Sequence, residues 1–259
     1  MKSIFAKKVT AKADSQLVNE VAKRLDAPAR RQFLKHSISL GSLAMLTGCD
    51  ASTDEGIEKM LGSVSRFNDR VQWALFNPDR LAQTYPDSMI QMPFPFNAYY
   101  GMNEVRHVDG NAWKLEVSGL VADKRAWTLP DFANLPQVAY TTRHICVEGW
   151  SAIGKWGGVP LKTFLEKVGA DMSARYIGFK CADDYYTSID MPTALHPQTL
   201  MSFTFADRTL PAEFGYPMKI RMPTKLGYKN PKHVMAMFVT NTNPGGYWED
   251  QGYNWFGGS

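Results

Sequence analysis

The stretch Arg143-His-Ile-Cys-Val-Glu-Gly-Trp-Ser-Ala-Ile-Gly-Lys-Trp-Gly-Gly-Val-Pro160 decides how the rest of the chain is interpreted. Residues 137–142 before it are rich in β-branched and aromatic side chains, which predicts a strand. Proline at the start and glycine just past the end predict a short helix over residues 160–168. Between these elements we expect a glycine-rich loop beginning near Cys146, in which the backbone can approach a bulky ligand.

Cys146 is the residue of this stretch with the most distinctive chemistry. A thiolate beside Arg143 and His144 would be a good soft ligand for a metal. The indoles of Trp150 and Trp156 would shield such a site from water. Considered alone, Cys146 is more consistent with a buried structural cysteine at a strand end.

Three motifs support the first interpretation: Cys146-Val-Glu-Gly-Trp-Ser151, the Trp-x-Gly-x-Pro-Leu run at residues 156–161, and Gly227-Tyr-Lys-Asn-Pro-Lys232. Together they resemble the sulfite-oxidase-type molybdopterin enzymes, most closely the periplasmic branch that contains methionine sulfoxide reductases. The resemblance covers roughly residues 95–240. It implies that Cys146 supplies the one protein sulfur on molybdenum, with the pterin dithiolene supplying the others.

The order of predicted elements indicates an α+β fold of mixed β-sheets with short helices. Strands are expected over residues 113–119, 137–142, 175–180, 183–189, 200–205, 216–222 and 233–240. The resemblance implies a molybdopterin-binding oxidoreductase domain over residues 81–259, without the C-terminal dimerisation domain of sulfite oxidases. We therefore expect a monomer.

Residues 49–80 are expected to form a tether and an amphipathic helix. From Ile57 to Leu75 the apolar residues recur at spacings of three and four, which predicts one apolar helix face. We expect that face to pack on the domain rather than on a membrane, because the opposite face mixes acids and bases.

Residues 1–48 have the layout of a twin-arginine signal peptide. Arg30-Arg31-Gln-Phe-Leu-Lys35 precedes an apolar run of about 11 residues, too short to span a bilayer. Leu46-Thr-Gly-Cys49 then resembles a lipobox, which implies a periplasmic protein anchored by lipid on Cys49 to the inner membrane. The alternatives are an ordinary amphipathic helix for the whole segment and simple cleavage near Gly48.

Charge and cysteine content exclude several classes of partner. Residues 1–48 hold nine Lys or Arg and three acids, and since the whole chain is +4, the remainder carries −2. Such a remainder does not favour nucleic-acid binding. No Cys-x-x-Cys-His motif for covalent haem is present, so we expect a separate electron-transfer partner, such as a membrane cytochrome. A disulfide between Cys146 and Cys181 remains an alternative in an oxidising compartment.

The resemblance also implies a set of site residues. The cofactor-binding positions are Asn97, Tyr100, Gly101, Cys146, Cys181, Lys219, Asn230, Pro231 and Lys232, and the catalytic positions are Cys146, Tyr185 and Tyr100. The cation-rich segment 219–233 suits the phosphate of molybdopterin, the alternative being a solvated basic strand edge. Cys181 is either a second metal-bound sulfur or a small packed residue, and Tyr185 either approaches the substrate oxygen or is structural.

Tyr100 bears on the substrate. Sulfite oxidases carry an arginine at the matching position, where it holds the sulfite anion, and a buried dianion needs such a cation. Arg106 and Arg143 could substitute, but neither matches that position. We therefore expect oxygen-atom transfer from a neutral S-oxide, such as a sulfoxide or methionine sulfoxide. The alternatives are sulfite oxidation by the same cofactor and a non-catalytic envelope scaffold.

Overall fold

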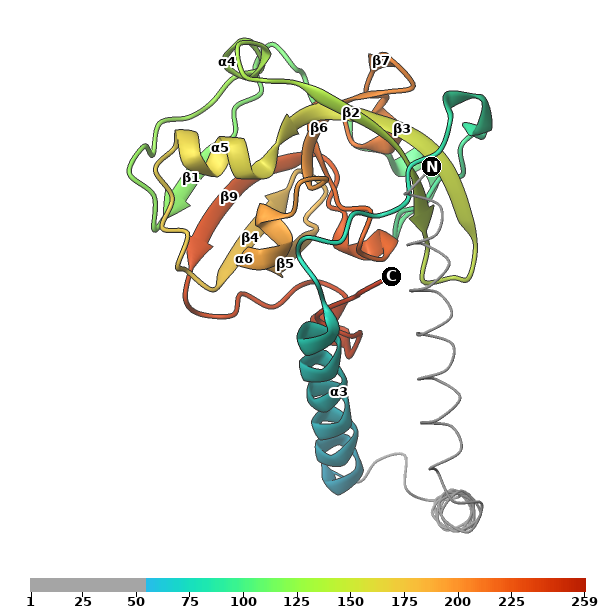
Figure 1. The fold of residues 1–259 in the computed structure, drawn as a ribbon, viewed down its shortest axis with the longest axis vertical. Coiled ribbons are helices and arrows are strands. Elements are labelled where there is room, and N and C mark those ends of the chain that lie inside the picture. Colours follow the sequence, from blue (N-terminus) through green and yellow to red (C-terminus); the bar gives the residue numbers. More distant parts are fainter. Residues whose placement is uncertain (1–54) are drawn as a thin grey trace, which may run out of the picture. The chain divides into compact units, whose positions relative to one another are not determined.

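Two β-sheets organise the part of the chain that the structure describes (Figure 1). The structure is a computed structural model and describes residues 55–259, with side chains from residue 62 onward. The predicted signal peptide and the predicted lipid-bearing Cys49 lie outside these residues. The chain divides into two units, residues 1–61 and 62–259, and the description below concerns the second.

The first sheet has four strands in the order β1-β9-β4-β5. It is mixed, because β1 pairs parallel with β9 whereas β4 pairs antiparallel with both β9 and β5. Its strands are β1 (Glu116–Gly119), β4 (Tyr176–Cys181), β5 (Tyr186–Asp190) and β9 (Val234–Thr240).

The second sheet has five strands, and all of its pairs are antiparallel. Its order is β2-β3-β6-β7, and β8 also pairs with β6. Its strands are β2 (Val138–Ile145), β3 (Ser151–Pro160), β6 (Leu200–Phe205), β7 (Arg208–Thr209) and β8 (Lys219–Arg221). The β2–β3 hairpin is the long ribbon at the top of Figure 1, and Cys146 lies in its turn. The predicted α+β class is thus confirmed.

Residues 151–160 form a strand, so the predicted glycine-rich loop was wrong beyond residue 150. A Cβ atom at Gly158 would come within 1.9 Å of the Met201 carbonyl oxygen in the neighbouring strand β6. Glycine inside a strand can serve close backbone approach as well as flexibility. The sequence alone did not distinguish these two uses.

Short helices connect the strands. Helix α5 (Leu161–Lys167) follows Pro160 directly and is followed by Gly169 at φ +62°, as predicted. It packs on β3 and on α6 (Met191–Leu195), and the predicted turn between prolines is α4 (Leu129–Ala133). The 3₁₀ helices are η2 (Asp87–Met89), η3 (Met102–Glu104), η4 (Ala212–Phe214), η5 (Gly227–Lys229) and η6 (Glu249–Gln251).

Two apolar clusters support the sheets. The larger one contains Trp113, Trp127, Phe132 and Phe164 together with the buried faces of β4 and β9. The smaller one is mainly aromatic and lies around β3; its buried members are Phe94, Ala152, Trp156, Phe205, Leu210 and Phe214. The smaller cluster matters for function because Trp156 contacts buried cations, as described below.

The predicted amphipathic helix is present as α3 (Glu55–Leu75), but the part of its apolar face that lies within residues 62–75 does not pack on the domain. Side chains on that face are exposed: Val64 by 50%, Phe67 by 63%, Val71 by 38% and Leu75 by 79%. The domain is contacted instead by a polar face, because Asp69 Oδ1 accepts a hydrogen bond from Phe256 N at 2.9 Å. The prediction was wrong because periodicity identifies an apolar face without showing what covers it. Within residues 55–259, none of the helices has the length and apolarity that crossing a membrane requires.

Candidate active site

A recess lies where the turn after β2, the segment 97–100, the start of β5 and the loop 227–232 meet. Its empty volume, open mouth included, is about 750 Å³, which is within the range typical of small-molecule and cofactor sites. Its lining includes Asn97, Tyr99, Tyr100, Cys146, Glu148, Asp183, Tyr185, Tyr228, Asn230, Pro231, Lys232, Trp248 and Tyr253.

Cys146 faces this recess from the hairpin turn. Its backbone N donates to Trp150 O at 2.9 Å, which holds the turn closed. The Sγ atom lies 3.8 Å from Asn97 Nδ2 and 3.6 Å from Glu148 Oε2. Burial raises the pKa of the Cys146 thiol above its ordinary value, so the free thiol holds its proton and a metal must displace it.

Glu148 is a recess residue that the sequence analysis did not single out. Its carboxylate lies beside the Cys146 sulfur and accepts a hydrogen bond from Trp150 Nε1 at 3.0 Å. The signal was available, since Glu148 belongs to the Cys-Val-Glu motif. It was missed because a charged residue in a turn is ordinarily solvated.

Most of the predicted site residues meet in this one recess. Those that line it are Asn97, Tyr100, Cys146, Tyr185, Asn230, Pro231 and Lys232. Gly101, Cys181 and Lys219 do not line it. The six residues that surround Cys146 come from segments between 97 and 232, and the fold brings them together.

Cys181 lies at the end of β4 and packs against the larger apolar cluster. Burial raises the pKa of its thiol well above the ordinary value. Both cysteines among the described residues are free, which does not support the disulfide alternative. Of the two readings of Cys181, this position agrees with the packed residue.

Lys219 lies behind the recess in a group of buried cations. Lys219, Arg221 and Lys232 are 2%, 1% and 8% exposed, so the alternative of a solvated strand edge was wrong. The Lys219 Nζ and Arg221 Cζ atoms lie 5.0 Å and 5.9 Å from the Trp156 ring centroid. Among residues 62–259, no carboxylate lies within ion-pair distance of these three cations. We call Lys219, Arg221 and Lys232 the unpaired cation group.

The electrostatics of the unpaired cation group are correspondingly unfavourable. Burial, with the charges of Lys232 and Arg221, lowers the pKa of Lys219 well below its ordinary value. Burial likewise lowers the pKa of Lys232 to about 8. Lys232 Nζ donates only to a neutral partner, the Glu213 carbonyl oxygen, at 2.7 Å. A bound anion would offset the cost of burying these charges.

His144 and Arg221 were not predicted as site residues and do not line the recess, but His144 lies beside Gly227 of its lining and Arg221 acts on His144. A Cβ atom on Gly227 would lie 2.9 Å from His144 Nε2 and 3.0 Å from Asn97 Nδ2. His144 Nδ1 and Arg221 Nε are buried without a hydrogen-bond partner among the described residues. Burial, together with Arg221, lowers the pKa of His144 well below its ordinary value, so the imidazole is neutral.

Asn230 anchors the loop behind the recess. Its Oδ1 accepts from Met222 N at 2.7 Å and from Arg221 Nη1 at 3.2 Å, and its Nδ2 donates to Leu226 O. These bonds fix the path of residues 226–230. Asn230 therefore shapes the recess chiefly through the backbone.

The tyrosines of the recess hold their protons. Tyr100 donates to Asp183 Oδ2 at 3.0 Å, and burial, with the Asp183 charge, raises the pKa of Tyr100. Tyr99 donates to the Asp183 carbonyl, and burial raises its pKa to about 12. Tyr185 donates to the Tyr228 carbonyl oxygen at 2.5 Å, and burial raises its pKa strongly. The Tyr185 hydroxyl is thus committed to the backbone rather than directed at a substrate.

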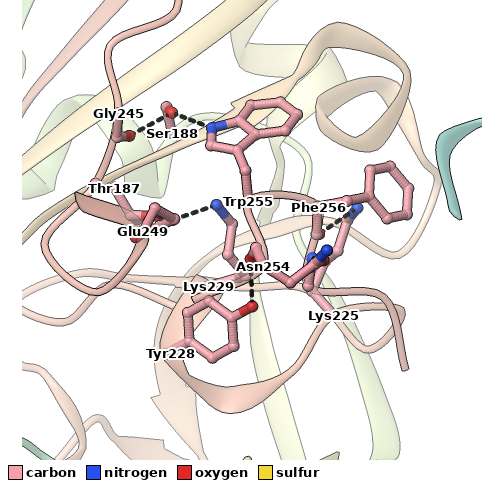
Figure 2. A network of polar contacts seen from close by, with 12 residues as sticks. Thr187, Ser188, Lys225, Tyr228, Lys229, Gly245, Glu249, Asn254, Trp255 and Phe256 are labelled. Atoms are coloured by element: carbon pink, nitrogen blue, oxygen red, sulfur yellow. Dashed lines mark hydrogen bonds and ion pairs between the residues drawn. The ribbon is translucent and has the colours of Figure 1, made fainter. Parts of the chain in front are cut away.

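A second group of buried charges fixes the opposite wall (Figure 2). Lys229 Nζ pairs with Glu249 Oε1, both side chains being nearly inaccessible, and Thr187 Oγ1 donates to the same oxygen at 2.6 Å. Tyr228 Oη donates to Asn254 O at 2.5 Å. We call Lys229, Glu249 and Thr187 the paired network. It holds the segment that carries Trp248 and Tyr253 against the recess.

These residues fit a molybdopterin. Cys146 offers one sulfur at the recess, and Lys232 links the recess to the unpaired cation group. The unpartnered buried Nε of Arg221 adds a further hydrogen-bond donor outside the lining. A soft metal and a phosphate have the chemistry that these two sets of donors require.

Comparison with known proteins agrees with this chemistry. Residues 102–248 match the family model described as the oxidoreductase molybdopterin binding domain. A protein of Azospira oryzae named "putative protein-methionine-sulfoxide reductase subunit YedZ1" is 65% identical over 240 residues, covering 93% of this chain and 92% of that protein. The protein-methionine-sulfoxide reductase catalytic subunit MsrP of Ralstonia nicotianae is 29% identical over 161 residues, covering 56% of this chain and 49% of that protein.

A solved structure resembles the fold. The sulfane dehydrogenase SoxCD of Paracoccus pantotrophus aligns with a TM-score of 0.50 at 18% identity, covering 53% of this chain and 40% of that chain. At this identity the likeness concerns the fold alone. It agrees with the α+β arrangement of sheets and short helices described above.

Proposed function

The chain belongs to the family of oxidoreductases with a molybdopterin-binding domain, and on that premise we propose that it reduces neutral S-oxides such as sulfoxides or methionine sulfoxide. As a member of this family it is a molybdenum-dependent oxidoreductase with molybdopterin as its cofactor. The proposal concerns the substrate and the direction of the reaction. Its support comes from the charges of the recess and from the names of the relatives.

The observation that carries the proposal is the charge of the recess lining. Its charged members are the carboxylates Glu148 and Asp183 and the ammonium of Lys232. Lys232 adjoins the unpaired cation group, so a cofactor phosphate would engage it. Tyr100, at the position where sulfite oxidases carry arginine, is neutral and donates to Asp183. The net negative charge of this lining would repel a sulfite dianion, whereas a neutral S-oxide carries no net charge to be repelled.

The residues of the chain have distinct tasks in this scheme. Cys146 would hold the metal, while Lys232 and the cations behind it would hold the phosphate. The cofactor, when bound, supplies a metal centre that accepts an oxygen atom and passes on electrons. Reduction of a sulfoxide to a thioether and water consumes an electron pair and two protons. Tyr99, Tyr100 and Tyr185 add no charge to the recess, because their hydroxyls stay protonated.

The electrons would come from a separate partner protein, and we propose that this partner is a membrane cytochrome. We place the enzyme in the periplasm, exported by the twin-arginine route and anchored at the inner membrane through lipid on Cys49. The support is the Arg-Arg-x-Phe-Leu-Lys pattern followed by Leu-Thr-Gly-Cys. A folded, cofactor-bearing protein needs such a route.

Sulfite oxidation by the same cofactor is the second candidate, and one assay separates the two. The purified enzyme is given reduced viologen with a small sulfoxide, and separately sulfite with an oxidised dye. We expect faster sulfoxide reduction, loss of all turnover in Cys146→Ser, and a shift toward anionic substrates in Tyr100→Arg with Tyr100→Phe as its matched control. Rapid sulfite oxidation without sulfoxide turnover would overturn the proposal. Absence of molybdenum in a correctly folded protein would favour the scaffold alternative.

A further inference from the structure

The mouth of the recess carries carboxylates that the protein itself leaves unpaired. They belong to Glu148 and Asp183 of the lining and to Asp184, which follows in the sequence. Glu148 and Asp184 are exposed, whereas Asp183 is buried. The side chains that donate to them are neutral, namely the Trp150 indole to Glu148 and the Tyr100 hydroxyl to Asp183. Among the described side chains, no cation lies within ion-pair distance of these three carboxylates.

Lys232 is the cation of the lining, and it does not cancel this negative charge. It acts on Asp183 only from beyond ion-pair distance. In the proposed function its ammonium binds the cofactor phosphate. A bound phosphate would take up the positive charge of Lys232, and the carboxylates at the mouth would remain.

Aromatic rings stand in a continuous row at the same mouth. The ring centroids of Tyr99 and Tyr247 lie 4.7 Å apart, those of Tyr247 and Trp248 5.3 Å, and those of Trp248 and Tyr253 4.9 Å. Tyr99, Trp248 and Tyr253 line the recess, and Tyr253 is 38% exposed. We call these four residues the aromatic row. Part of it is open to a molecule that enters the recess.

The carboxylates and the aromatic row lie together. Burial, and then the charges of Asp183 and Asp184, raise the pKa of Tyr99 to about 12, so both carboxylates act on this end of the row. Glu148 faces the recess from the hairpin turn, with Oε2 3.6 Å from Cys146 Sγ. A carboxylate attracts a cation by its charge, and the face of an aromatic ring attracts it by the ring quadrupole. Ammonium and guanidinium groups are the chemistry that this combination favours.

We infer that the mouth of the recess binds a positively charged group of the substrate, so that the preferred S-oxides carry an ammonium or guanidinium group near the sulfoxide. This inference rests on the proposed function and adds the charge of its substrate. Glu148 lies beside the sulfur that would hold the metal, so a cation a few bonds from the reacting sulfur can reach its carboxylate. The cation is held in place and takes no part in the transfer of oxygen, electrons or protons.

Three derivatives of methionine sulfoxide test the inference, because they share the sulfoxide and differ in charge. Methionine sulfoxide amide is a cation at about pH 6.5, below the ordinary pKa of an α-amino group. N-acetyl-methionine sulfoxide amide is neutral, and N-acetyl-methionine sulfoxide is an anion. The kcat/KM per bound molybdenum is measured on the full, cofactor-bearing protein. The electron donor is a reduced sulfonated viologen, which has no net positive charge and does not compete for the mouth.

We expect the cation to exceed the neutral amide in kcat/KM by about tenfold at low salt, from one ion pair and one ring contact together. The anion should fall below the neutral amide. In about 1 M salt, where the screening length is about 3 Å, the advantage of the cation should largely disappear.

Variants that remove one charge identify the carboxylates. Glu148→Gln and Asp184→Asn should each lower the ratio of cation to neutral amide by about threefold. Asparagine accepts the left-handed φ of +64° at position 184, so this variant keeps the turn. Glu166→Gln, at an exposed position of α5, is the matched control and should leave the ratio unchanged.

Binding of the three compounds is measured in parallel, by tryptophan fluorescence of the oxidised protein without a donor. Equal kcat/KM for the cation and the neutral amide at low salt would overturn the inference, as would a cationic preference that survives in the double variant. If no compound is turned over but the cation binds most tightly, the proposed function fails and the charge selectivity stands. Absence of turnover together with equal dissociation constants would overturn both.

Discussion

Lys229 and Lys232 are separated by two residues in the sequence and are both buried, yet the charges around them differ. Lys229 belongs to the paired network, where Glu249 neutralises it and Thr187 supports the carboxylate (Figure 2). Lys232 belongs to the unpaired cation group, where its hydrogen bond goes to a carbonyl oxygen and the carboxylates of Asp183 and Glu213 act on it only from beyond ion-pair distance. In the first arrangement the lysine charge is neutralised within the protein itself, whereas the second becomes favourable only with an anion. The difference separates a lysine that stabilises the fold from one that holds a cofactor.

The largest expected effect is on the paired network. Glu249→Ala leaves Lys229 buried without a counter-charge, which should lower the free energy of unfolding by about 3–5 kcal/mol. Urea unfolding should show this loss with and without the cofactor. The exposed Glu166→Ala should change stability by less than about 1 kcal/mol as the matched control. A loss confined to the cofactor-free protein would contradict the assignment of this pair to the fold.

Lys232→Ala should act in the opposite way. Cofactor retention should weaken by about 1.5–3 kcal/mol, because a charge-assisted contact to the phosphate is lost. The cofactor-free protein should not lose stability, since a buried unpaired charge is removed. Molybdenum content after dialysis and urea unfolding measure the two effects, with the exposed Lys180→Ala as control. Unchanged molybdenum loading would remove Lys232 from the cofactor site.

The pH dependence of stability gives a third test. Burial lowers the pKa of Lys225 to about 7 and of Lys232 to about 8. Above these values the folded protein has released protons that the unfolded chain still binds up to its ordinary lysine pKa near 10.5. The unfolding free energy of the cofactor-free protein should therefore rise from pH 7 to pH 8.5, by about 2 kcal/mol for the two groups together.

The cofactor should reduce that rise, since a bound phosphate restores the pKa of Lys232. Lys225 lies on the Phe256 ring, in the part of the structure drawn in Figure 2, and should contribute equally in both forms. Thermal or urea unfolding across this range measures the slopes. Two results would contradict the lowered pKa of Lys232 and its contact with the phosphate. One is a fall in unfolding free energy over this pH range. The other is an equal slope of unfolding free energy against pH with and without the cofactor.

The smallest expected effect concerns the support of the paired network. Thr187→Val removes the hydroxyl that donates to Glu249 and should cost about 1 kcal/mol in unfolding free energy. Thr209→Val, at an exposed position of β7, should change stability by less than about 0.5 kcal/mol. A cost equal to that of Glu249→Ala would mean that the hydroxyl, rather than the lysine, holds the carboxylate.

Local sequence patterns were sufficient for much of the fold. The helix α5 between Pro160 and Gly169, the strand β6 and the alternation within β9 follow from side-chain periodicity and terminal residues. Cys146 was identified from its motif, and the cations of segment 219–233 from their density. These features depend on neighbours within a few residues, so they can be predicted from local sequence patterns.

The tertiary structure decided what each of these residues contacts. In the tertiary structure Gly158 of β3 allows close packing against β6, and Cys181 lies outside the recess. The apolar side chains of α3 within residues 64–75 are exposed. It also paired Lys229 with Glu249, whereas no carboxylate of residues 62–259 lies within ion-pair distance of Lys232. Such outcomes depend on segments that are distant in the sequence, because burial and charge neutralisation are set by whatever the fold brings alongside. A basic segment can be found from sequence, but which of its lysines needs an anion depends on that long-range packing.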